Sequence, residues 1–425
     1  MSGLALLGGS PLRRKPFAFR NNISKEEINA ANRVLKSGVL SDFIGAAHDH
    51  FFGGKEVLAY ETTCKEYFGS KHAISVNSAT SALYMAIGSA GIVPGDEVIV
   101  TPYSMCASAT CALVYGGIPV FADVDPQTFC LSAKDIELKI TSKTKAIVVV
   151  NLFGQAAELK QIKNIALKNN LVMIEDCAQA PGAKFDNQYC GTYADMGIFS
   201  LNCHKTMQTG EGGVLITDND ELAYKCQLIR NHGESVIDNK KWEPNNLVNH
   251  LGWNYRLTEM QAAMATEQLK KIDLFNQKRR ENIFYLNKKL KEFDFLEIPK
   301  VNNNAFHVYY LHAILFKKEK IGISREIFLN ALNAEGIPFS GGYVKPIYLL
   351  PIFQKKIAFG NKYPFSYAEN TLNYKKGECP VVENLYQEKM ITHFIFHEYL
   401  DKNDLDDIIN AIEKVANLAS SLNND

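Results

Sequence analysis

One stretch of the chain reads Phe199-Ser-Leu-Asn-Cys-His-Lys205-Thr-Met-Gln-Thr-Gly-Glu-Gly-Gly213. It sets a lysine between an apolar approach and a glycine-rich exit, and the exit runs into a second apolar segment, Val214–Thr217. Glycines suit a loop in which the backbone packs so closely that no Cβ fits. The pattern predicts a strand, a tight loop and a second strand, which would hold Lys205 on a fixed platform. A lysine held and partly desolvated in this way is competent to form a Schiff base, whereas the alternative is a surface lysine beside a hairpin turn.

Short apolar runs and helical segments alternate along the chain around this stretch. The apolar runs are His72–Val76, Glu97–Thr101, Pro119–Val124, Ala146–Asn151, Leu171–Glu175, Gly197–Ser200 and Val214–Thr217. The helical segments that follow them include Ala79–Gly91, Ser104–Val114, Ala157–Lys168 and Glu221–Arg230. The alternation predicts an α/β fold with a mostly parallel sheet covered by helices on both faces. Ligands of such sheets bind beyond the carboxyl ends of the strands.

Three regions are expected along the chain. Residues 1–24 are rich in Gly, Pro and Arg and would form an N-terminal arm, residues 25–290 the large domain, and residues 291–425 a smaller C-terminal α+β domain. The first helix is expected at Lys25–Ser37, and Thr258 is placed to cap one long helix, Glu259–Leu290. The strands expected in the small domain are Val308–Leu315 and Met390–Phe396, and its helices are Ser324–Glu335 and Asn403–Leu422.

The composition narrows the class of protein. Of 425 residues, 46% are hydrophobic and 22% are charged, and Lys+Arg and Asp+Glu both number 46. A balanced charge leaves no electrostatic footprint for nucleic acid, and no apolar run approaches the roughly 20 residues that span a bilayer. The nine cysteines lack CxxC spacing and nearby histidine pairs, so we expect reduced cysteines in a cytoplasmic protein and no metal site.

Small and hydroxylated residues follow the first of the predicted strands. The sequence Asn77-Ser-Ala-Thr80-Ser81-Ala82 comes directly after this strand and opens the next helix. Backbone N–H groups at a helix N-terminus attract anions, so the segment is a candidate phosphate site. An ordinary helix cap is the alternative.

Two other polar groups stand at comparable positions. Glu175 and Asp176 end an apolar strand, where a carboxylate is costly to bury unless it is paired. A carboxylate there can keep a cationic ring nitrogen protonated, as an electron-sink cofactor requires, and Gln179 could reach the same ring. The alternative is that one of the two acids caps the following turn. Trp253-Asn254-Tyr255-Arg256 precedes the long helix, with ordinary packing and a helix cap as its alternative.

A phosphate cradle, a carboxylate and a lysine in this order on an α/β sheet describe a pyridoxal phosphate (PLP) site of the aspartate-aminotransferase kind. The chain also resembles the sugar aminotransferases of the DegT/DnrJ/EryC1/StrS family. The matching motifs are Asn77–Leu83, Pro94–Val98, Pro119–Val124, Glu175–Ala183, Ser200–Gly213 and Asn254–Gln261. The combination of EDxAQAxGA with SxxxxKxxxTGEGG is highly specific to this family.

The resemblance implies a role for each matching residue that faces the cofactor. Lys205 would form the Schiff base with PLP and then, once freed by substrate, move the proton during transfer. Asp176 would bind the pyridinium nitrogen, and Gln179 would lie by the 3-hydroxyl group.

The resemblance also implies the phosphate site, the oligomer and the fold. Thr80, Ser81 and Ser200 would hold the phosphate, together with Asn254 from the neighbouring subunit of a homodimer. The family fold is the type I aminotransferase fold, a mixed seven-stranded sheet with a small C-terminal domain.

Two positions differ from the family pattern or lie next to a critical one. Met105 aligns with an aromatic residue that many members stack on the pyridine ring, and a methionine can also lie against a ring. Relatives with histidine in place of the lysine catalyse 3-dehydration of keto-sugars. His204 is adjacent to Lys205, but Lys205 keeps the family spacing from Ser200 and from the TGEGG sequence.

The resemblance implies transfer of an amino group from glutamate or glutamine to the ketone of a sugar, usually nucleotide-linked, in amino-sugar biosynthesis for surface polysaccharides or secondary metabolites. Leu4–Pro11 and Cys379–Leu385 resemble instead the branch that acts on keto-cyclitols of the scyllo-inosose type and on aminohydroxybenzoate precursors. Two further alternatives are a PLP-dependent keto-sugar 3-dehydratase and a sensor that uses PLP without turnover.

Four residues are candidates to contact the substrates. Relatives place a histidine-rich loop where this chain has Gly341–Tyr348, so Tyr343, Lys345 and Tyr348 are expected to line the acceptor pocket. Arg256 is expected to pair with an anionic group of the donor or acceptor, with an ion pair at the dimer interface as the alternative.

Overall fold

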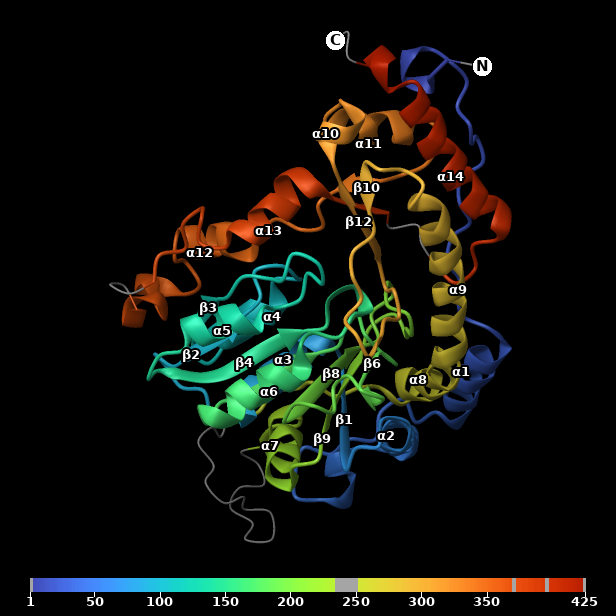
Figure 1. Cartoon of the computed structure of the whole chain (residues 1–425). Helices are drawn as coiled ribbons and strands as arrows, with labels where there is room; N and C mark the ends of the chain where they lie inside the picture. The colour runs from blue at the N-terminus through green and yellow to red at the C-terminus, as the bar shows by residue number, and fades with distance from the viewer. Residues whose placement is uncertain (1–2, 234–250, 369–371, 394–396, 423–425) are drawn as a thin grey trace.

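The computed structural model describes residues 3–233, 251–368, 372–393 and 397–422. A seven-stranded sheet covered by helices forms the larger part, and a four-stranded sheet with its own helices lies beside it (Figure 1). The segment Glu234–His250, for which the sequence predicts irregular structure, lies outside the described residues.

The seven-stranded sheet contains all seven strands predicted for the N-terminal half. They are β1 (His72–Val76), β2 (Glu97–Val100), β3 (Ile118–Phe121), β4 (Thr144–Val150), β5 (Val172–Asp176), β8 (Met196–Ser200) and β9 (Gly213–Thr217). Their order in the sheet is β1-β9-β8-β5-β4-β2-β3. The neighbouring strands β3, β2, β4, β5 and β8 are parallel, whereas β9 runs antiparallel to both β8 and β1. The sheet is therefore mixed, and β9 is reversed because a short loop joins it to β8.

Helices pack on this sheet, and the last of them, α9, also packs on the four-stranded sheet. They are α1 (Lys25–Ser37), α2 (Lys55–Phe68), α3 (Ala79–Ser89), α4 (Ala107–Leu113), α5 (Ala133–Lys139), α6 (Leu159–Lys168), α7 (Asp220–Arg230), α8 (Glu259–Lys270) and α9 (Ile272–Leu290). The prediction of one long helix over Glu259–Leu290 is wrong, because the helix is interrupted at Lys271 and the segment forms two helices, α8 and α9. The ammonium group of Lys271 binds Glu27 at the start of α1, 2.8 Å away. The interruption between α8 and α9 therefore coincides with an ion pair to a distant part of the chain. No glycine or proline at this position indicates it in the sequence.

The smaller sheet has the strand order β10-β12-β14-β13 and is antiparallel throughout. Its strands are β10 (Leu296–Glu297), β12 (His312–Phe316), β13 (Ser340–Gly341) and β14 (Met390–His393), and its main helices are α11 (Arg325–Ala334) and α14 (Lys402–Asn417). β12 begins four residues later than the predicted strand Val308–Leu315. The last three residues of the predicted strand Met390–Phe396 lie outside the described part of the chain.

Helix α9 joins the two sheets. Its first residue, Ile272, belongs to the core of the large sheet, whereas Ile283, Leu286 and Leu290 belong to the core of the small one. Figure 1 shows α9 running alongside both sheets. The domain boundary at residue 290 remains a prediction, because one continuous helix contributes to both cores.

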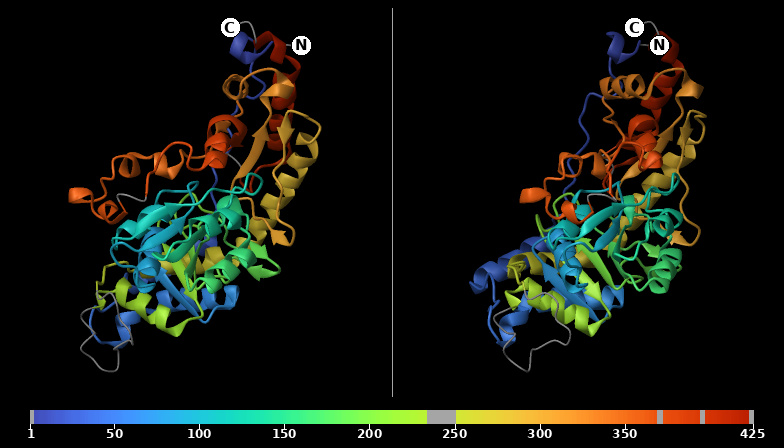
Figure 2. Two further views of the ribbon diagram at one scale, coloured as in Figure 1. Left: turned by 60° about the vertical axis from the view of Figure 1, so that its left-hand side comes forward. Right: turned by 90° about the vertical axis from the view of Figure 1, so that its left-hand side faces the viewer.

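The N-terminal arm, like α9, runs past both sheets, on the outside of the molecule. It starts beside the C-terminal helix α14, at the end of the molecule where both termini lie, and runs down to α1 (Figures 1 and 2). The backbone N–H groups of Ala5 and Leu12 each donate to the carboxylate of Glu335, both at 2.9 Å. The arm is therefore docked on the small domain before it reaches the large one. Among the described residues, no helix is long and apolar enough to cross a membrane.

Candidate active site

Lys205 lies in the loop that joins β8 to β9. The loop begins as a hairpin, since Leu201 N–H donates to the Gly212 carbonyl and Cys203 N–H donates to the Gly210 carbonyl, both at 2.9 Å. The predicted arrangement of strand, tight loop and strand is therefore confirmed. The Lys205 side chain is half-buried, and its Nζ lies 4.8 Å from the centre of the Tyr310 ring.

Gly213 brings this loop against the N-terminus of α3. A Cβ at Gly213 would lie 2.8 Å from the backbone nitrogen of Ala79 and 2.9 Å from the Phe199 carbonyl oxygen. Both neighbours are backbone atoms, so neither can move aside as a flexible side chain would. The close approach places Ser200, which pairs with Gly213 across the sheet, next to the segment that carries Thr80 and Ser81.

Hydroxyl groups cluster at the start of α3. The hydroxyl oxygen of Ser78 accepts from the backbone N–H of Ser81 at 3.0 Å, so Ser78 is the N-cap. Ser81 Oγ donates to Asn77 Oδ1 at 2.6 Å, and Thr80 is half-buried. The segment is thus a capped helix terminus and also an array of N–H and hydroxyl groups that suits a phosphate.

The acidic pair divides into two functions because successive residues of a strand point to opposite faces. Glu175 is fully buried, and its carboxylate accepts from Asn151 Nδ2 and from the backbone N–H groups of Gly191, Tyr193 and Ala194 at 2.8–3.1 Å. Burial raises the pKa of Glu175 above its usual value, and these donors oppose that shift. Glu175 therefore organises the chain that follows the strand.

Asp176 takes the other face, at the carboxyl end of β5. Its Oδ2 accepts from Ser108 Oγ at 2.7 Å, and its Oδ1 accepts from the backbone N–H of Ala178 at 3.0 Å. The turn-capping alternative is thus correct for one oxygen, while Ser108 on α4 orients the other. Sequence reasoning missed Ser108, because no local motif links it to a residue 68 positions away.

Gln179 meets Tyr343 beside this carboxylate. Its amide nitrogen donates to the Tyr343 hydroxyl at 2.9 Å, and its amide oxygen accepts from Phe153 N–H at 2.8 Å. The Tyr343 ring packs edge-to-face on Phe153, with 4.9 Å between the ring centres. Burial raises the pKa of Tyr343, so its hydroxyl stays protonated at neutral pH. The fold thus brings together two predicted site residues that are 164 positions apart.

The other predicted substrate residues are spread more widely. Tyr348 is completely buried, packs on Phe121 and donates its hydroxyl proton to Glu383, so it belongs to the core and not to a pocket surface. Lys345 is exposed. Met105, which is expected to lie against the cofactor ring and not against the substrate, is 58% exposed. Met105 has therefore kept a free surface that a ring could cover.

Asn254 and Arg256 lie at the rim of the hydroxyl cluster. The backbone N–H of Asn77 donates to the Tyr255 carbonyl at 2.9 Å, and Arg256 Nε donates to Asn254 Oδ1 at 2.8 Å. The Trp253 and Tyr255 rings stack with 5.9 Å between their centres. The segment 253–256 is partly exposed, so its side chains are available for a second chain or a ligand.

These groups fit pyridoxal phosphate. The carboxyl ends of β1, β5 and β8 lie at one edge of the sheet and bear a helix terminus with hydroxyl groups, an oriented carboxylate and the lysine loop. They match, in order, the phosphate, the ring nitrogen and the aldehyde of the cofactor. The close contact at Gly213 leaves the lysine loop and the phosphate segment side by side, as one cofactor requires.

Sequence comparisons support the same assignment. A model of the DegT/DnrJ/EryC1/StrS aminotransferase family matches residues 21–413. The L-glutamine:2-deoxy-scyllo-inosose aminotransferase of Streptomyces kanamyceticus is 32% identical over 426 residues and is covered to 97%, as is this chain. The GDP-perosamine synthase of Caulobacter vibrioides is 35% identical over 300 residues, which are 70% of this chain and 78% of that protein.

Solved structures agree with the fold. The aminotransferase from Psychrobacter cryohalolentis matches with a TM-score of 0.82 and 28% identity over 96% of this chain and 100% of that one. NtdA from Bacillus subtilis, with bound pyridoxamine phosphate, matches with a TM-score of 0.77 and 25% identity over 96% of this chain and 87% of that one. The fold and the site therefore define a PLP-dependent aminotransferase of fold type I. The chain belongs to the DegT/DnrJ/EryC1/StrS aminotransferase family, as its motifs indicate.

Glu175 and Asp176 provide a matched pair of substitutions. We expect Glu175→Gln to lower the free energy of unfolding by about 2 kcal/mol or more, because an amide cannot accept from all the N–H groups around it. We expect Asp176→Asn to leave stability nearly unchanged and to lower turnover by roughly 100-fold or more. Urea unfolding and steady-state rates measure the two effects. Equal losses of turnover at similar stability would contradict the division of functions.

Proposed function

We propose that this aminotransferase moves an amino group from glutamate or glutamine to the ketone of a nucleotide-linked keto-sugar, in amino-sugar biosynthesis. The observation that carries the proposal is the position of the Lys205 amine, half-buried over the Tyr310 ring at the edge where Asp176 and the hydroxyl cluster also lie. The relative named GDP-perosamine synthase supports a nucleotide-linked sugar as acceptor.

A keto-cyclitol of the scyllo-inosose type is the second candidate acceptor. The relative that acts on 2-deoxy-scyllo-inosose matches 97% of both chains, and the N-terminal segment Leu4–Pro11 resembles the same branch. Its name also specifies glutamine as the amino donor. The 3-dehydratase alternative is less well supported, because Lys205 keeps the lysine position and the neighbouring His204 is exposed.

Lys205 and Asp176 have complementary roles in the proposed mechanism. When bound, PLP supplies an electron sink for the carbanion formed at the substrate carbon. Lys205 Nζ would hold the cofactor and, when free, would carry the proton to and from the substrate carbon. Asp176, oriented by Ser108, would hold the proton on the ring nitrogen. The Gln179 amide, fixed by Phe153 and Tyr343, would lie beside the ring.

The acceptor is proposed to enter through a cavity of about 650 Å³ beside the lysine loop. Its volume falls within the range of roughly 300–1,000 Å³ that is typical of small-molecule sites. The polar residues of the lining are Arg20, Cys203, His204, Arg279, Tyr310, His393 and His397. Polar imidazole groups suit a polyhydroxylated ring. Tyr343, Lys345 and Arg256 remain proposed contacts, whereas the burial of Tyr348 removes it from the set.

Isotope-labelled glutamate and glutamine test the proposed reaction. The PLP-loaded enzyme is incubated with each donor and with a panel of nucleotide-linked keto-sugars and scyllo-inosose, and labelled products are identified by mass spectrometry. We expect the label in an amino-sugar and an equivalent amount of 2-oxo acid, and neither with Lys205→Ala. Transfer to scyllo-inosose alone would favour the second candidate. Labelled donor that stays intact with every acceptor would contradict both.

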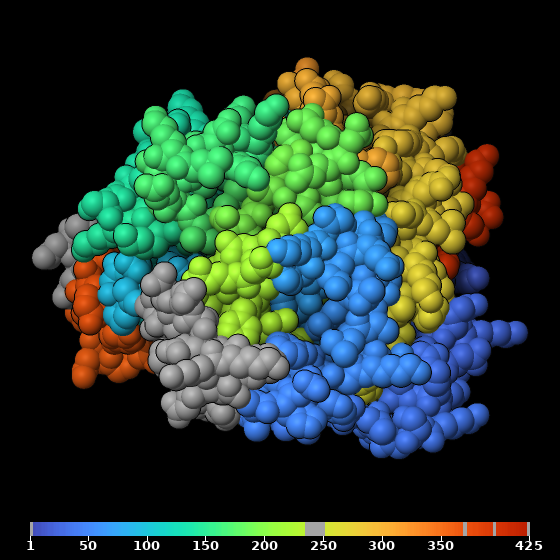
Figure 3. Space-filling view, turned by 90° about the horizontal axis from the view of Figure 1, so that it is seen from below, coloured from blue at the N-terminus to red at the C-terminus, as the bar shows by residue number. Residues whose placement is uncertain are grey.

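We also propose that the enzyme is a homodimer with shared active sites. Apolar side chains are exposed on and beside the N-terminal helices and on the segment that begins at Trp253. They are Ile28, Leu35, Val39, Leu40, Leu58 and Trp253. Figure 3 shows the N-terminal part of the chain, in blue, on the lower face of the molecule. Large apolar side chains exposed in this way are common at subunit interfaces, and the proposal places them at the contact between the two subunits. Asn254 lies next to Trp253, which supports its proposed contribution to the phosphate site of the other subunit.

Mixed dimers test this sharing. Lys205→Ala and Asn254→Ala proteins are each expected to have little activity, and mixing them under subunit exchange should restore part of the turnover. Restoration follows because one of the two sites in a mixed dimer then has both native residues. If Asn254 serves the site of its own chain, both sites of the mixed dimer stay defective and turnover does not recover.

A further inference from the structure

Two arginines share one carboxylate close to the lysine loop. Glu398 is 3% exposed and accepts from Arg20 on the N-terminal arm and from Arg279 on α9, at 2.8–3.0 Å. Arg279 is 2% exposed. Burial acts against ionisation, but the two guanidinium groups hold the pKa of Glu398 below its usual value. The carboxylate is therefore charged and binds the arm, α9 and the small domain to one another.

The remaining donors of the two arginines reach both sides of Lys205. Arg20 donates through Nη1 to the Lys205 carbonyl oxygen at 2.8 Å and through Nη2 to the Thr206 carbonyl oxygen at 2.5 Å. Arg279 donates through Nη1 to the carbonyl oxygens of Tyr309 and Tyr310, both at 3.2 Å. The two arginines and Glu398 thus hold the backbone at Lys205 and also the backbone at Tyr310, the residue whose ring lies under the Lys205 amine.

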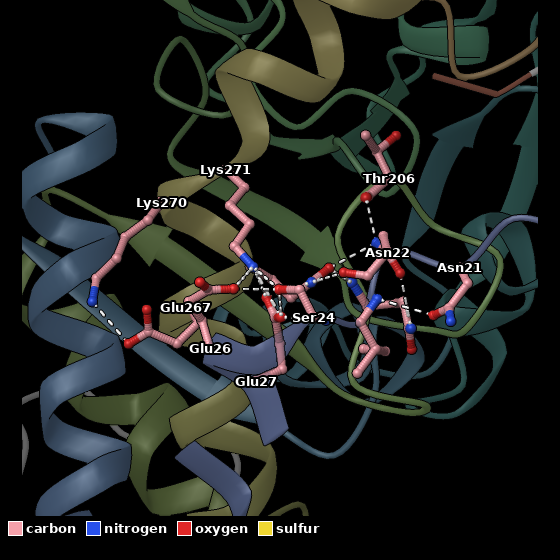
Figure 4. Close-up of polar contacts among 12 residues, drawn as sticks. Asn21, Asn22, Ser24, Glu26, Glu27, Thr206, Glu267, Lys270 and Lys271 are labelled. Carbon is pink, nitrogen blue, oxygen red and sulfur yellow. Dashed lines mark hydrogen bonds and ion pairs between the residues drawn. The ribbon is translucent and has the colours of Figure 1, made fainter. Parts of the chain in front are cut away.

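A second set of contacts supports the arm at the same place. Asn22 donates to the Thr206 carbonyl oxygen at 3.2 Å and to Gln268 Oε1 at 2.8 Å, and Gln268 donates to Glu27 Oε1 at 2.8 Å. Figure 4 shows Asn22 beside Thr206, with Glu27 and Lys271 on the other side. Asn22, Gln268 and Glu27 are all buried. A continuous series of buried hydrogen bonds therefore runs from α8 through the arm to the lysine loop.

We propose that Arg20 is a positioning residue for Lys205. The planar Arg20 guanidinium binds two consecutive carbonyl oxygens of the loop. Its charge is balanced by Glu398, which also binds Arg279, the donor to the Tyr310 carbonyl oxygen. The fork geometry of arginine makes all these bonds at once, which a lysine cannot do. The inference rests on the proposed role of Lys205. A catalytic group displaced by about 1 Å costs roughly 100-fold in rate, so a loop needs such an anchor.

Arg13 offers a control on the same arm. It binds Asp404 and Asp407 of α14 at 2.8 and 2.7 Å, and its guanidinium lies 3.8 Å from the centre of the Phe17 ring. These partners belong to the small domain and the arm, and the lysine loop is not among them. Docking of the arm and positioning of the loop can therefore be disturbed separately.

The test compares Arg20→Met, Arg20→Lys and Arg13→Met. In Arg20→Met, Glu398 keeps Arg279 as its partner, so no buried carboxylate loses every cation. Hydrogen–deuterium exchange of the cofactor-free proteins is followed over residues 201–209 and 1–15, and kcat and KM are measured after loading with PLP. Exchange over 201–209 reports the loop itself, independently of the identity of the lysine that binds the cofactor.

Arg20→Met is expected to accelerate exchange over residues 201–209 and to lower kcat by about 10- to 100-fold. Arg20→Lys should recover only part of either effect. Arg13→Met should accelerate exchange over residues 1–15 and leave the lysine loop and kcat unchanged. Unchanged loop exchange and kcat in Arg20→Met would overturn the inference, as would the same loop exchange in Arg13→Met as in Arg20→Met. If the cofactor proves to be bound by another lysine, the proposed role of Lys205 fails, while loop exchange still decides whether Arg20 holds the loop.

Discussion

The backbone contact between Gly213 and the start of α3 is the constraint on which the site depends. A side chain at Gly213 would collide with backbone atoms of Ala79 and Phe199, so β9 can lie against α3 only because this residue has no Cβ. The contact brings the end of the lysine loop next to the hydroxyl cluster. Gly213 also pairs with Val76 of β1 and with Ser200 of β8, so this one residue lies at the point where the three strands β1, β9 and β8 meet.

The alternation of side chains along β5 has a comparable importance. Glu175 and Asp176 are neighbours in sequence but serve opposite faces of the strand, one tying down the segment 191–194 and the other facing α4. A buried carboxylate is tolerated on each face because it is surrounded by N–H or O–H donors. Glu175 thereby stabilises the end of β5 from one face of the strand, while Asp176 points to the other face.

Most of the large sheet could be predicted because buried strands read as apolar runs and glycine-rich turns separate them. Lys205, Asp176, Gln179 and the hydroxyl cluster could be found because each ends or follows such a run. Ser108, Arg20 and Tyr310 could not, since only the tertiary fold brings them to the site. The same limit explains the missed break at Lys271, which accompanies an ion pair with Glu27, and the burial of Tyr348 against Phe121.

Lys205 is proposed to be the residue that binds the cofactor, and covalent trapping identifies that residue. The PLP-loaded protein is treated with borohydride, which reduces the bond between the cofactor and its lysine to a stable amine, and the digest is analysed by mass spectrometry. We expect the added mass on the peptide that contains Lys205, and its loss in Lys205→Arg. Modification of a different lysine, or retention of the added mass in Lys205→Arg, would show that Lys205 is not the anchor.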